Sequence, residues 1–195
     1  MILASASKAR ADLLRAAGVD VDIHPARIDE AAVKQAMLAE DASPRDIADM
    51  LAELKAKQVS MRHPHILILG ADQVLVCEDQ LFDKAETMVE ARSHLQQLSG
   101  KTHHLYSAAV IARDGEPVWR HVGHARLSMR PFTEAFLDNY LDRVGDLALS
   151  SVGCYHLEGL GAQLFARVEG DYFTVLGLPL LEVLGFLRAQ EVLVE

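Results

Sequence analysis

The chain has 195 residues, half of them hydrophobic and 24% charged. This length and composition predict one folded domain over residues 1–195 and exclude a disordered chain. The formal net charge of −9 excludes a broad basic surface for nucleic acid or for an anionic membrane. It does not exclude a small basic pocket that binds one phosphorylated ligand.

The two cysteines, Cys77 and Cys154, lie far apart and form no CxxC pair. A disulfide framework is therefore not expected, and reduced thiols are typical of cytoplasmic proteins. Residues 1–8 have no basic leader before their short apolar run, so they do not resemble a signal peptide. The longest apolar region, residues 175–187, is interrupted by a proline and a glutamate and is too short to span a bilayer. We expect a cytoplasmic protein that binds no membrane.

The first half of the chain alternates predicted strands and helices. Ser7, Asp29 and Ser43 each stand where a helix needs an N-cap, and Gly18 can end the first helix. The apolar run over 66–76 predicts a strand buried on both faces. The expected elements are a strand over 1–4, a helix from 7 to about 17, a strand over 19–24, a helix from 29 to about 40, a helix from 43 to about 61 and the strand over 66–76.

The second half predicts a helix, a hairpin and further helices. An apolar stripe indicates the first helix, which ends at Ser99-Gly100, and Asp114-Gly115 is typical of a hairpin turn. The expected elements are a helix over 88–98, strands over 103–113 and 117–130, a helix from 133 to about 143, a loop over 150–161, strands over 162–168 and from 171 to about 176, and a helix from 179 onward. This order predicts an α/β or α+β fold with a mixed sheet.

Asp72 interrupts the apolar strand, where an unpaired carboxylate is costly to bury. Gly70 and Ala71 leave space beside it for a ligand or for another backbone. The carboxylate is either paired with a neighbouring cation, or it is a metal ligand or general base at a strand end. The residues alone leave both alternatives open.

The turn Ser5-Ala6-Ser7-Lys8-Ala9-Arg10 follows the first strand and opens the first helix. Free N–H groups at a helix start, together with two hydroxyls and two cations, can bind an anion, and phosphate suits them well. An ordinary serine cap followed by basic residues is the alternative.

Four further charged residues, two of which are alternatives to one another, are candidates for a site that binds a phosphorylated ligand. Glu30 begins a predicted helix, where an acid also complements the helix dipole. Lys55 and Lys57 stand two positions apart on a helix, so at most one of them faces a pocket. Lys84 follows an acidic turn, and a plain surface lysine is its alternative.

The sequence predicts neither a histidine metal site nor several well-known nucleotide-binding and hydrolase motifs. The nine histidines include close sets, but none places two rings on one side of its own element, so no histidine metal site is expected. The motifs GxxxxGK[ST], GxGxxG, GxSxG and HExxH are absent from the sequence. This argues against P-loop ATP chemistry and against an α/β-hydrolase serine nucleophile.

The chain opens with Leu3-Ala4-Ser5-Ala6-Ser7-Lys8-Ala9-Arg10, followed by Asp12-Leu13-Leu14. Further short motifs are Asp29-Glu30, Ala52-x-x-Lys55-Ala56, Gly70-Ala71-Asp72-Gln73-Val74, Leu98-Ser99-Gly100, Glu158-Gly159 and Gly177-Leu178-Pro179-Leu180. In their order and approximate spacing these motifs resemble those of the Maf family of nucleotide pyrophosphatases. The resemblance implies an elongated α/β fold, with a central mixed twisted sheet and two lobes around a cleft. It also implies a homodimer that hydrolyses nucleoside triphosphates to the monophosphate and pyrophosphate, using Mg²⁺ or Mn²⁺.

The resemblance also implies roles for particular residues. Glu30 and Asp72 are expected to be metal ligands, and Asp72 is expected to accept the proton of the attacking water. Lys55 and Lys84 are expected to hold phosphates and to neutralise developing charge. The substrate-binding residues of the opening are expected to be Ser5, Ser7, Lys8 and Arg10, with Ser7 and Arg10 on the triphosphate.

Two stretches resemble the family branch that acts on 7-methyl-GTP: the pair Asp72-Gln73 and the sequence Glu158-Gly159-Leu160-Gly161. Gln73, Tyr155 and Glu158 are then candidates for base recognition. An acid can accept hydrogen bonds from the guanine edge, and an aromatic ring can stack on a cationic methylated base.

The chain departs from the family pattern at three places, the mildest of which is Asp12 where the family has a glutamate. Lys8 and Ala9 stand where the family has a proline and an arginine, and a lysine restores the charge without the planar fork of an arginine. Asp83-Lys84-Ala85 replaces the usual Gly-Lys-Pro.

Two other functions compete with pyrophosphate release. One is a non-catalytic nucleotide-binding regulator linked to cell division, and the other is a nucleotidase that releases orthophosphate. A pure binder has little need for paired acids beside a polyphosphate, which argues against the first.

Overall fold

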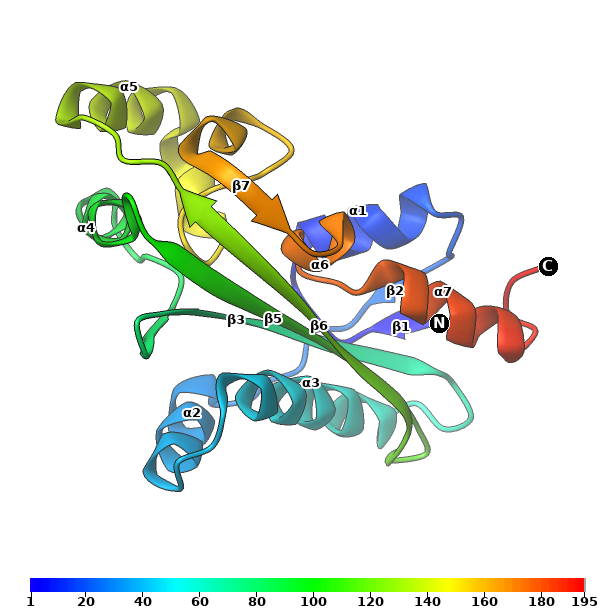
Figure 1. Ribbon diagram of the computed structural model, residues 1–195. Coiled ribbons are helices and arrows are strands. Elements are labelled where there is room, and N and C mark those ends of the chain that lie inside the picture. Colours follow the sequence, from blue (N-terminus) through cyan, green and yellow to red (C-terminus); the bar gives the residue numbers. More distant parts are fainter. Residues whose placement is uncertain (195) are drawn as a thin grey trace. The chain divides into compact units, whose positions relative to one another are not determined.

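The computed structural model describes residues 1–194, which form a mixed α/β fold (Figure 1). The strands make one mixed sheet in the order β2-β1-β3-β5-β6-β7, and β4 pairs with β3. The strands are β1 (Ile2–Leu3), β2 (Asp22–Ile23), β3 (Ile68–Cys77), β4 (Gln80–Phe82), β5 (Thr102–Arg113), β6 (Glu116–Met129) and β7 (Phe165–Glu169). The α-helices are α1 (Lys8–Ala16), α2 (Glu30–Ala39), α3 (Pro44–Ser60), α4 (Met88–Leu98), α5 (Glu134–Val144), α6 (Tyr172–Val175) and α7 (Leu180–Ala189). Two 3₁₀-helices are η1 (Gly145–Ser150) and η2 (Leu160–Leu164).

The chain divides into two compact units. Unit 1 comprises residues 1–73, residues 106–123 and the chain from residue 171 onward. Unit 2 comprises residues 74–105 and residues 124–170. The long strands β3, β5 and β6 each contribute residues to both units.

Unit 1 has three layers, with α3 on one face of its strands and α1 and α7 on the other (Figure 1). The register is parallel, with Ile2 beside Asp22 on one side and beside Ile68 on the other. Two hydrophobic clusters fill the spaces between the layers. The cluster on the side of α1 and α7 includes Leu3, Leu14, Leu69, Ala71, Ile111, Leu180, Val183 and Leu187. The cluster on the side of α3 consists of Ile2, Ala4, Val59 and Ile68.

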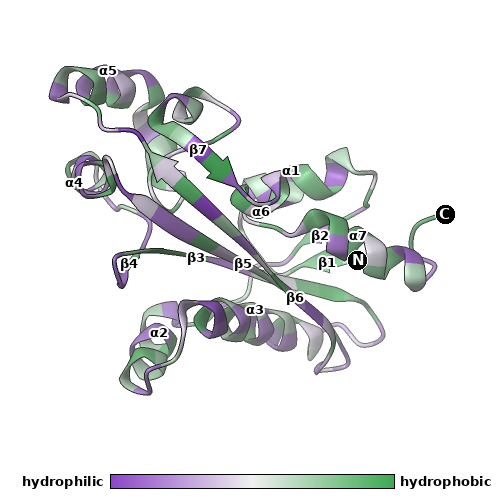
Figure 2. Ribbon diagram, viewed as in Figure 1, coloured by the Kyte–Doolittle hydropathy of each residue, from purple (hydrophilic) through white to green (hydrophobic). Residues whose placement is uncertain are grey.

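The alternation of side chains along β3 sets which residues of this strand face which helices. Ile68 belongs to the cluster under α3, whereas Leu69 and Ala71 belong to the cluster under α1 and α7. Because successive side chains of a strand point to opposite faces, Asp72 faces α3 and Gln73 faces the other layer. Figure 2 shows α3 with alternating hydrophilic and hydrophobic residues, as expected for a helix that covers one face of a sheet.

Unit 2 is built around β4, β7 and its parts of the long strands. β7 pairs antiparallel with β6, with Leu127 opposite Val168. On its helical side Arg92 of α4 forms ion pairs with Glu134 and Asp138 of α5. Its interior contains Tyr155, whose ring contacts those of His103 and Phe165.

Most predicted elements are confirmed, because their ends are set locally. Ser7, Asp29 and Ser43 each accept a hydrogen bond from a backbone N–H in the first turn of the helix that follows. Thr133 does the same for α5, and the hairpin turns at the predicted residues 114 and 115. Strand β2 is shorter than expected and covers only residues 22 and 23.

The prediction of a strand from 171 to about 176 was wrong, because this segment is α6. The side chain of Asp171 accepts a hydrogen bond of 2.7 Å from the backbone N–H of Thr174 and so caps a helical turn. Gly170, just before it, has φ +117, a backbone conformation that ends the preceding strand β7 and favours glycine. The local cap therefore overrides the β-propensity of Tyr-Phe-Thr-Val.

Two other expectations also need correction. The predicted strand over 162–168 begins only at Phe165, because residues 160–164 form η2. Here Gly161 lies so close to the backbone of His156 that a Cβ would sit 2.5 Å from its oxygen. Strand β4 was not predicted, because Glu78 and Asp79 both adopt positive φ in its turn, which a sequence usually signals with glycine or asparagine.

Both cysteines are buried, and both are free thiols. Within residues 1–194 no helix is long and apolar enough to cross a membrane.

Candidate active site

A lysine and two carboxylates meet in unit 1. Oδ1 of the buried Asp72 on β3 accepts a hydrogen bond of 2.6 Å from Nζ of Lys55 on α3. The same ammonium lies 2.8 Å from Oε1 of Glu30, the first residue of α2. The side chain of Lys55 is 10% exposed and that of Glu30 is 44% exposed, so solvent reaches the group from the side of Glu30. Asp72 therefore has a cation partner, which is one of the two alternatives that the sequence left open.

A glycine brings α3 close enough to β3 for this contact. Gly70 faces α3, two residues before Asp72, and a Cβ built on it would lie 2.1 Å from the carbonyl oxygen of Ala52. The same Cβ would lie 2.6 Å from the backbone nitrogen of Ala56. Only a residue without a side chain allows two backbones to approach so closely. Lys55, between these two alanines in α3, is thereby held within reach of Asp72.

The opening of α1 lies in the same unit. Ser7 caps the helix, and its hydroxyl accepts from the N–H of Arg10 at 3.4 Å. The hydroxyl of Ser5 accepts from the N–H of Ser7 at 3.2 Å and from Nη1 of Arg10 at 3.1 Å. The two serines thus order the first turn, whose N–H groups and positive dipole end favour an anion.

The guanidinium of Arg10 is buried and is held mainly by backbone carbonyls. Nε donates to the oxygen of Gly177 at 2.8 Å, and Nη1 donates to the oxygen of Ala71 at 2.8 Å. Together with the bond to Ser5, these contacts use three of the five N–H groups of the guanidinium. The two N–H groups of Nη2 take no part in these three bonds. Burial lowers the pKa of Arg10 from its ordinary value, while Asp72 and Glu30 act in the opposite direction. Because Ala71 directly precedes Asp72 in β3, the bond from Nη1 places the guanidinium of Arg10 near this part of the strand.

Lys8 makes no contact with the cluster of Glu30, Lys55 and Asp72. Its ammonium pairs with Asp12 one turn along α1, and its side chain is 88% exposed. Lys57 likewise lies elsewhere and pairs with Glu53, so only Lys55 of the two neighbouring lysines reaches the carboxylates.

Gln73 lies next to Asp72 but on the opposite face of β3. Its Nε2 lies within hydrogen-bond distance of Oγ of Ser107 and of the carbonyl oxygens of Thr174 and Val175. Ser107 and Thr174 are buried, and no motif in the sequence pointed to either of them.

The remaining predicted residues belong to unit 2. Lys84 is exposed and pairs by its backbone with Val152 in an isolated bridge. Glu158 is exposed, and its Oε1 lies 3.2 Å from Nδ1 of His156. Tyr155 is 4% exposed, and its hydroxyl lies 2.7 Å from Nε2 of His103. This enclosure of the ring argues against the stacking role that the resemblance implied for Tyr155.

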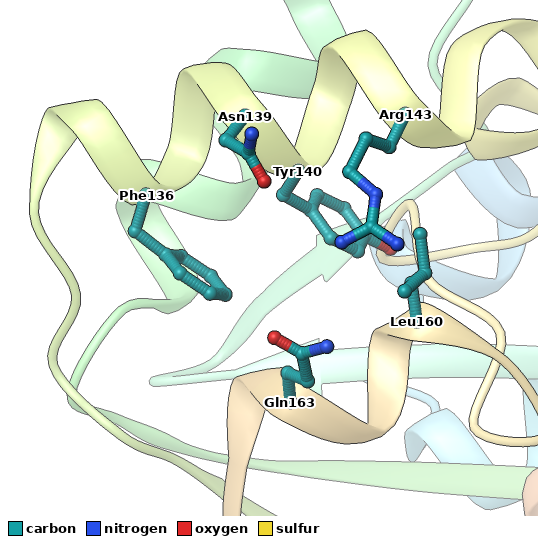
Figure 3. A pocket seen from close by; sticks show the side chains of 6 residues that line it. All are labelled: Phe136, Asn139, Tyr140, Arg143, Leu160 and Gln163. Carbon is teal, nitrogen blue, oxygen red and sulfur yellow. The ribbon is translucent and has the colours of Figure 1, made fainter.

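A separate hollow lies in unit 2 between α5 and η2 (Figure 3). Its lining consists of Phe136, Asn139, Tyr140, Arg143, Leu160 and Gln163. Arg143 and Gln163 point toward one another across it (Figure 3). It measures about 180 Å³ including its open mouth, and none of the predicted site residues lines it.

The donor set of unit 1 limits what metal it could hold. Among residues 1–194 there is no group of three or more His, Cys, Asp or Glu side chains that could bind a metal ion. Glu30 and Asp72 offer two carboxylates, and both already contact the ammonium of Lys55. Mg²⁺ often binds proteins through one or two carboxylates, with water and substrate phosphates as its other ligands. The pair therefore fits a hard divalent ion shared with a phosphorylated ligand, and it does not fit an ion caged by protein alone.

The structure is a mixed α/β protein in which the start of α1, Arg10 and a carboxylate–lysine cluster lie in one unit, a combination of groups that suits a phosphorylated ligand. Residues 1–190 match the family described as Maf-like protein, and the chain belongs to the Maf family. The resemblance drawn from the sequence motifs is thereby confirmed.

Similar proteins carry two kinds of name. "Nucleoside triphosphate pyrophosphatase 1" of Jannaschia sp. (strain CCS1) is 55% identical over 96% of this chain and 95% of its own length. "Nucleoside triphosphate pyrophosphatase" of Caulobacter vibrioides is 54% identical over 95% of this chain and 93% of its own. "7-methyl-GTP pyrophosphatase" of Rhizobium etli is 51% identical over 96% of this chain and 94% of its own.

Proposed function

We propose that this chain is an enzyme that hydrolyses nucleoside triphosphates to the nucleoside monophosphate and pyrophosphate. The family and the names of relatives that match nearly the whole chain support this activity. The observation that carries it is the contact of Lys55 with both Glu30 and Asp72, in the unit where Arg10 of α1 binds the carbonyl of the residue before Asp72. Such a group offers a base, cations and an anion-binding helix start to one polyphosphate.

Within this proposal Glu30 and Asp72 hold a divalent cation, Mg²⁺ or Mn²⁺. Two carboxylates suit such an ion when substrate phosphates complete its coordination. When bound, the ion neutralises phosphate charge and makes the phosphorus more susceptible to attack.

The protein's own side chains accept the proton, bind the phosphates and stabilise the developing charge. Asp72 accepts the proton of the water that attacks the α-phosphorus, because its carboxylate is held in place by Lys55. Arg10 and the N–H groups that Ser7 orders hold the β- and γ-phosphates, and they stabilise the charge that develops on the departing pyrophosphate. The ammonium of Lys55 counters the same charge. No covalent intermediate is required.

The same proposal extends to the preferred nucleobase of the substrate and to the oligomeric state of the protein. Relatives named for 7-methyl-GTP favour a modified purine triphosphate as a substrate to be tested, with Glu158 on the guanine edge. Lys84 contacts phosphate in this proposal, which for this residue rests on the motif alone. We further propose that residues 1–195 act as one domain in a cytoplasmic homodimer, on the strength of the family resemblance.

The substitution Asp72→Asn tests the proposed function. It keeps the shape of the side chain but removes the base, so turnover should fall by on the order of 10²–10⁴-fold while the far-UV circular dichroism stays unchanged. Asp46→Asn, on an exposed residue of the same helix as Lys55, is the matched control and should retain activity.

The products decide between this function and its rivals. Phosphorus NMR should show pyrophosphate and a monophosphate when common, methylated and deaminated triphosphates are supplied with Mg²⁺ or Mn²⁺. Orthophosphate as the first product would indicate a nucleotidase of another kind. Nucleotide binding without metal-dependent pyrophosphate release would indicate a regulator and would refute the proposal.

A further inference from the structure

The loop that connects β2 to α2 leads directly to Glu30, and we call residues 24–29 the 24–29 loop. Its first residue, His24, donates its backbone N–H to the oxygen of Leu3 at 3.0 Å and so continues the pairing of β2 with β1. Among residues 1–194, residues 25–28 form no hydrogen bond with other backbone groups. The position of this loop, and of Glu30 behind it, therefore depends on bonds from side chains.

The side chain of Gln58 on α3 supplies such bonds. Its Oε1 accepts the backbone N–H of Arg27 at 2.7 Å, and its Nε2 donates to the backbone oxygen of Arg27 at 2.8 Å. The amide can be oriented in one way only, because the backbone nitrogen only donates and the backbone oxygen only accepts. A side-chain amide carries the same donor and acceptor as a peptide group. Gln58 therefore takes the place of the neighbouring strand that this part of the loop lacks.

These two bonds lie beside the ion pair of Lys55 with Glu30. Gln58 stands three residues after Lys55 in α3, so the two side chains emerge on the same side of the helix. Nζ of Lys55 lies 2.8 Å from Oε1 of Glu30, which stands three residues after Arg27. Two successive positions on one side of α3 thus bind two points of the chain that are equally close in sequence.

Other contacts hold the first half of the 24–29 loop. Nδ1 of His24 lies 3.0 Å from Nε2 of His63, so one imidazole donates a hydrogen bond to the other. Ala26 packs against the hydrophobic cluster that contains Val59 of α3. These contacts remain when the amide of Gln58 is removed, so its loss should loosen the second half of the loop without releasing the first.

The end of the loop is tied to α2. The carboxylate of Asp29 accepts the backbone N–H of Ala32 at 3.0 Å and caps this helix. A displacement of Arg27 is therefore transmitted to Glu30, the first residue of α2. The side chain of Glu30 is 44% exposed, so packing alone does not hold its carboxylate in place.

We infer that Gln58 is a positioning residue, whose amide fixes the 24–29 loop on α3 and thereby holds the carboxylate of Glu30 beside Lys55. The inference rests on the proposed function, in which Glu30 binds a divalent cation. Three observations carry it. Both hydrogen bonds of the amide go to the backbone of Arg27, residues 25–28 lack other backbone partners among residues 1–194, and Gln58 shares one side of α3 with Lys55.

Gln58→Met tests the attachment of the loop without nucleotide or metal. Methionine has nearly the length and the helix propensity of glutamine but cannot form the two hydrogen bonds. Hydrogen exchange of the Arg27 amide should become roughly tenfold faster, the effect of losing hydrogen bonds of ordinary strength. The midpoint of urea unfolding should stay unchanged, because the loop opens locally.

The dependence of pyrophosphate release on Mn²⁺ tests whether the loop positions Glu30. In Gln58→Met the Mn²⁺ concentration for half-maximal rate should rise roughly tenfold, whereas the turnover at saturating Mn²⁺ should stay within about twofold of the parent value. In a Glu30→Gln background the same substitution should change this concentration by less than about twofold, because coupled residues are not additive. Gln35→Met, on an exposed glutamine of α2, is the control and should leave both measurements unchanged.

The outcomes distinguish the inference from the function on which it rests. Unchanged exchange of the Arg27 amide, or an unchanged dependence on Mn²⁺, would overturn the inference. So would a tenfold effect that persists in the Glu30→Gln background, because Gln58 would then act through another residue. An unsubstituted chain that protects the Arg27 amide but releases no pyrophosphate would instead overturn the proposed function. If Gln58→Met does not fold, as judged by circular dichroism, Gln58→Ala replaces it in every measurement.

Discussion

The contact between α3 and β3 can be tested by adding a single methyl group at Gly70. In Gly70→Ala the new Cβ would lie 2.1 Å from the carbonyl oxygen of Ala52 and 2.6 Å from the backbone nitrogen of Ala56. Both neighbours are backbone atoms, so neither can rotate away. The helix α3 must therefore move away from the strand, and Lys55 moves with it.

The size of the movement follows from the distances. To move from 2.1 Å to an ordinary contact of 3.4 Å, α3 must retreat by about 1.3 Å. The distance between Nζ of Lys55 and Oδ1 of Asp72 would then grow from 2.6 Å to about 3.9 Å, beyond hydrogen-bond length. Misplacement of a catalytic group by about 1 Å can lower turnover roughly 10²-fold. Overpacking of this kind also costs about 1–3 kcal/mol of unfolding free energy.

The assay is pyrophosphate release at saturating nucleotide, combined with urea unfolding. Gly70→Ala should lose about 10²-fold in turnover and lower the free energy of unfolding. Gly185→Ala is the matched control, because a Cβ there meets only the far end of Arg188 at 4.0 Å and the position is inside α7. This control should keep full turnover and gain about 0.5–1 kcal/mol of stability. Wild-type turnover in Gly70→Ala would show that the close approach of α3 does not hold Lys55 in its working position.

Two further predictions concern the ammonium of Lys55 and the buried ring of His103. Lys55→Met removes the ammonium that Glu30 and Asp72 share, so the metal-free chain should be less stable and turnover should fall by on the order of 10²–10³-fold. Calorimetry without nucleotide should at the same time show tighter binding of Mn²⁺, whereas weaker binding would mean that Lys55 does not compete for these oxygens. Burial, with a smaller contribution from His104, lowers the pKa of His103 from 6.5 to about 4. Between these two values only the unfolded chain binds the proton, so His103 should destabilise the fold by about 3 kcal/mol as the pH falls from 6.5 to 4. Urea unfolding at several pH values should show a shallower loss for His103→Gln, and parallel curves for the two chains would contradict this reasoning.

The elements that the sequence predicted correctly are those whose ends are fixed by neighbouring residues. Ser7 caps α1 by a hydrogen bond to a residue three positions away, and such contacts depend on the local sequence alone. The same local chemistry explains the failure at α6, where the cap formed by Asp171 outweighed an apolar run that is typical of a strand. The family was also identifiable from the sequence, because its short motifs keep their order along the chain.

For the site, the amino-acid sequence alone identified Asp72 as an acid that needs a partner, since an apolar strand makes an unpaired charge costly. It also limited the pair Lys55 and Lys57 to one inward-facing member. Only the tertiary structure decided that this member is Lys55 and that Gly70 brings its helix within reach. The tertiary structure likewise gave Gln73 its partners 101 and 102 positions away in the chain. Partners so distant are chosen by the packing of helices on a sheet, which no local pattern of residues encodes.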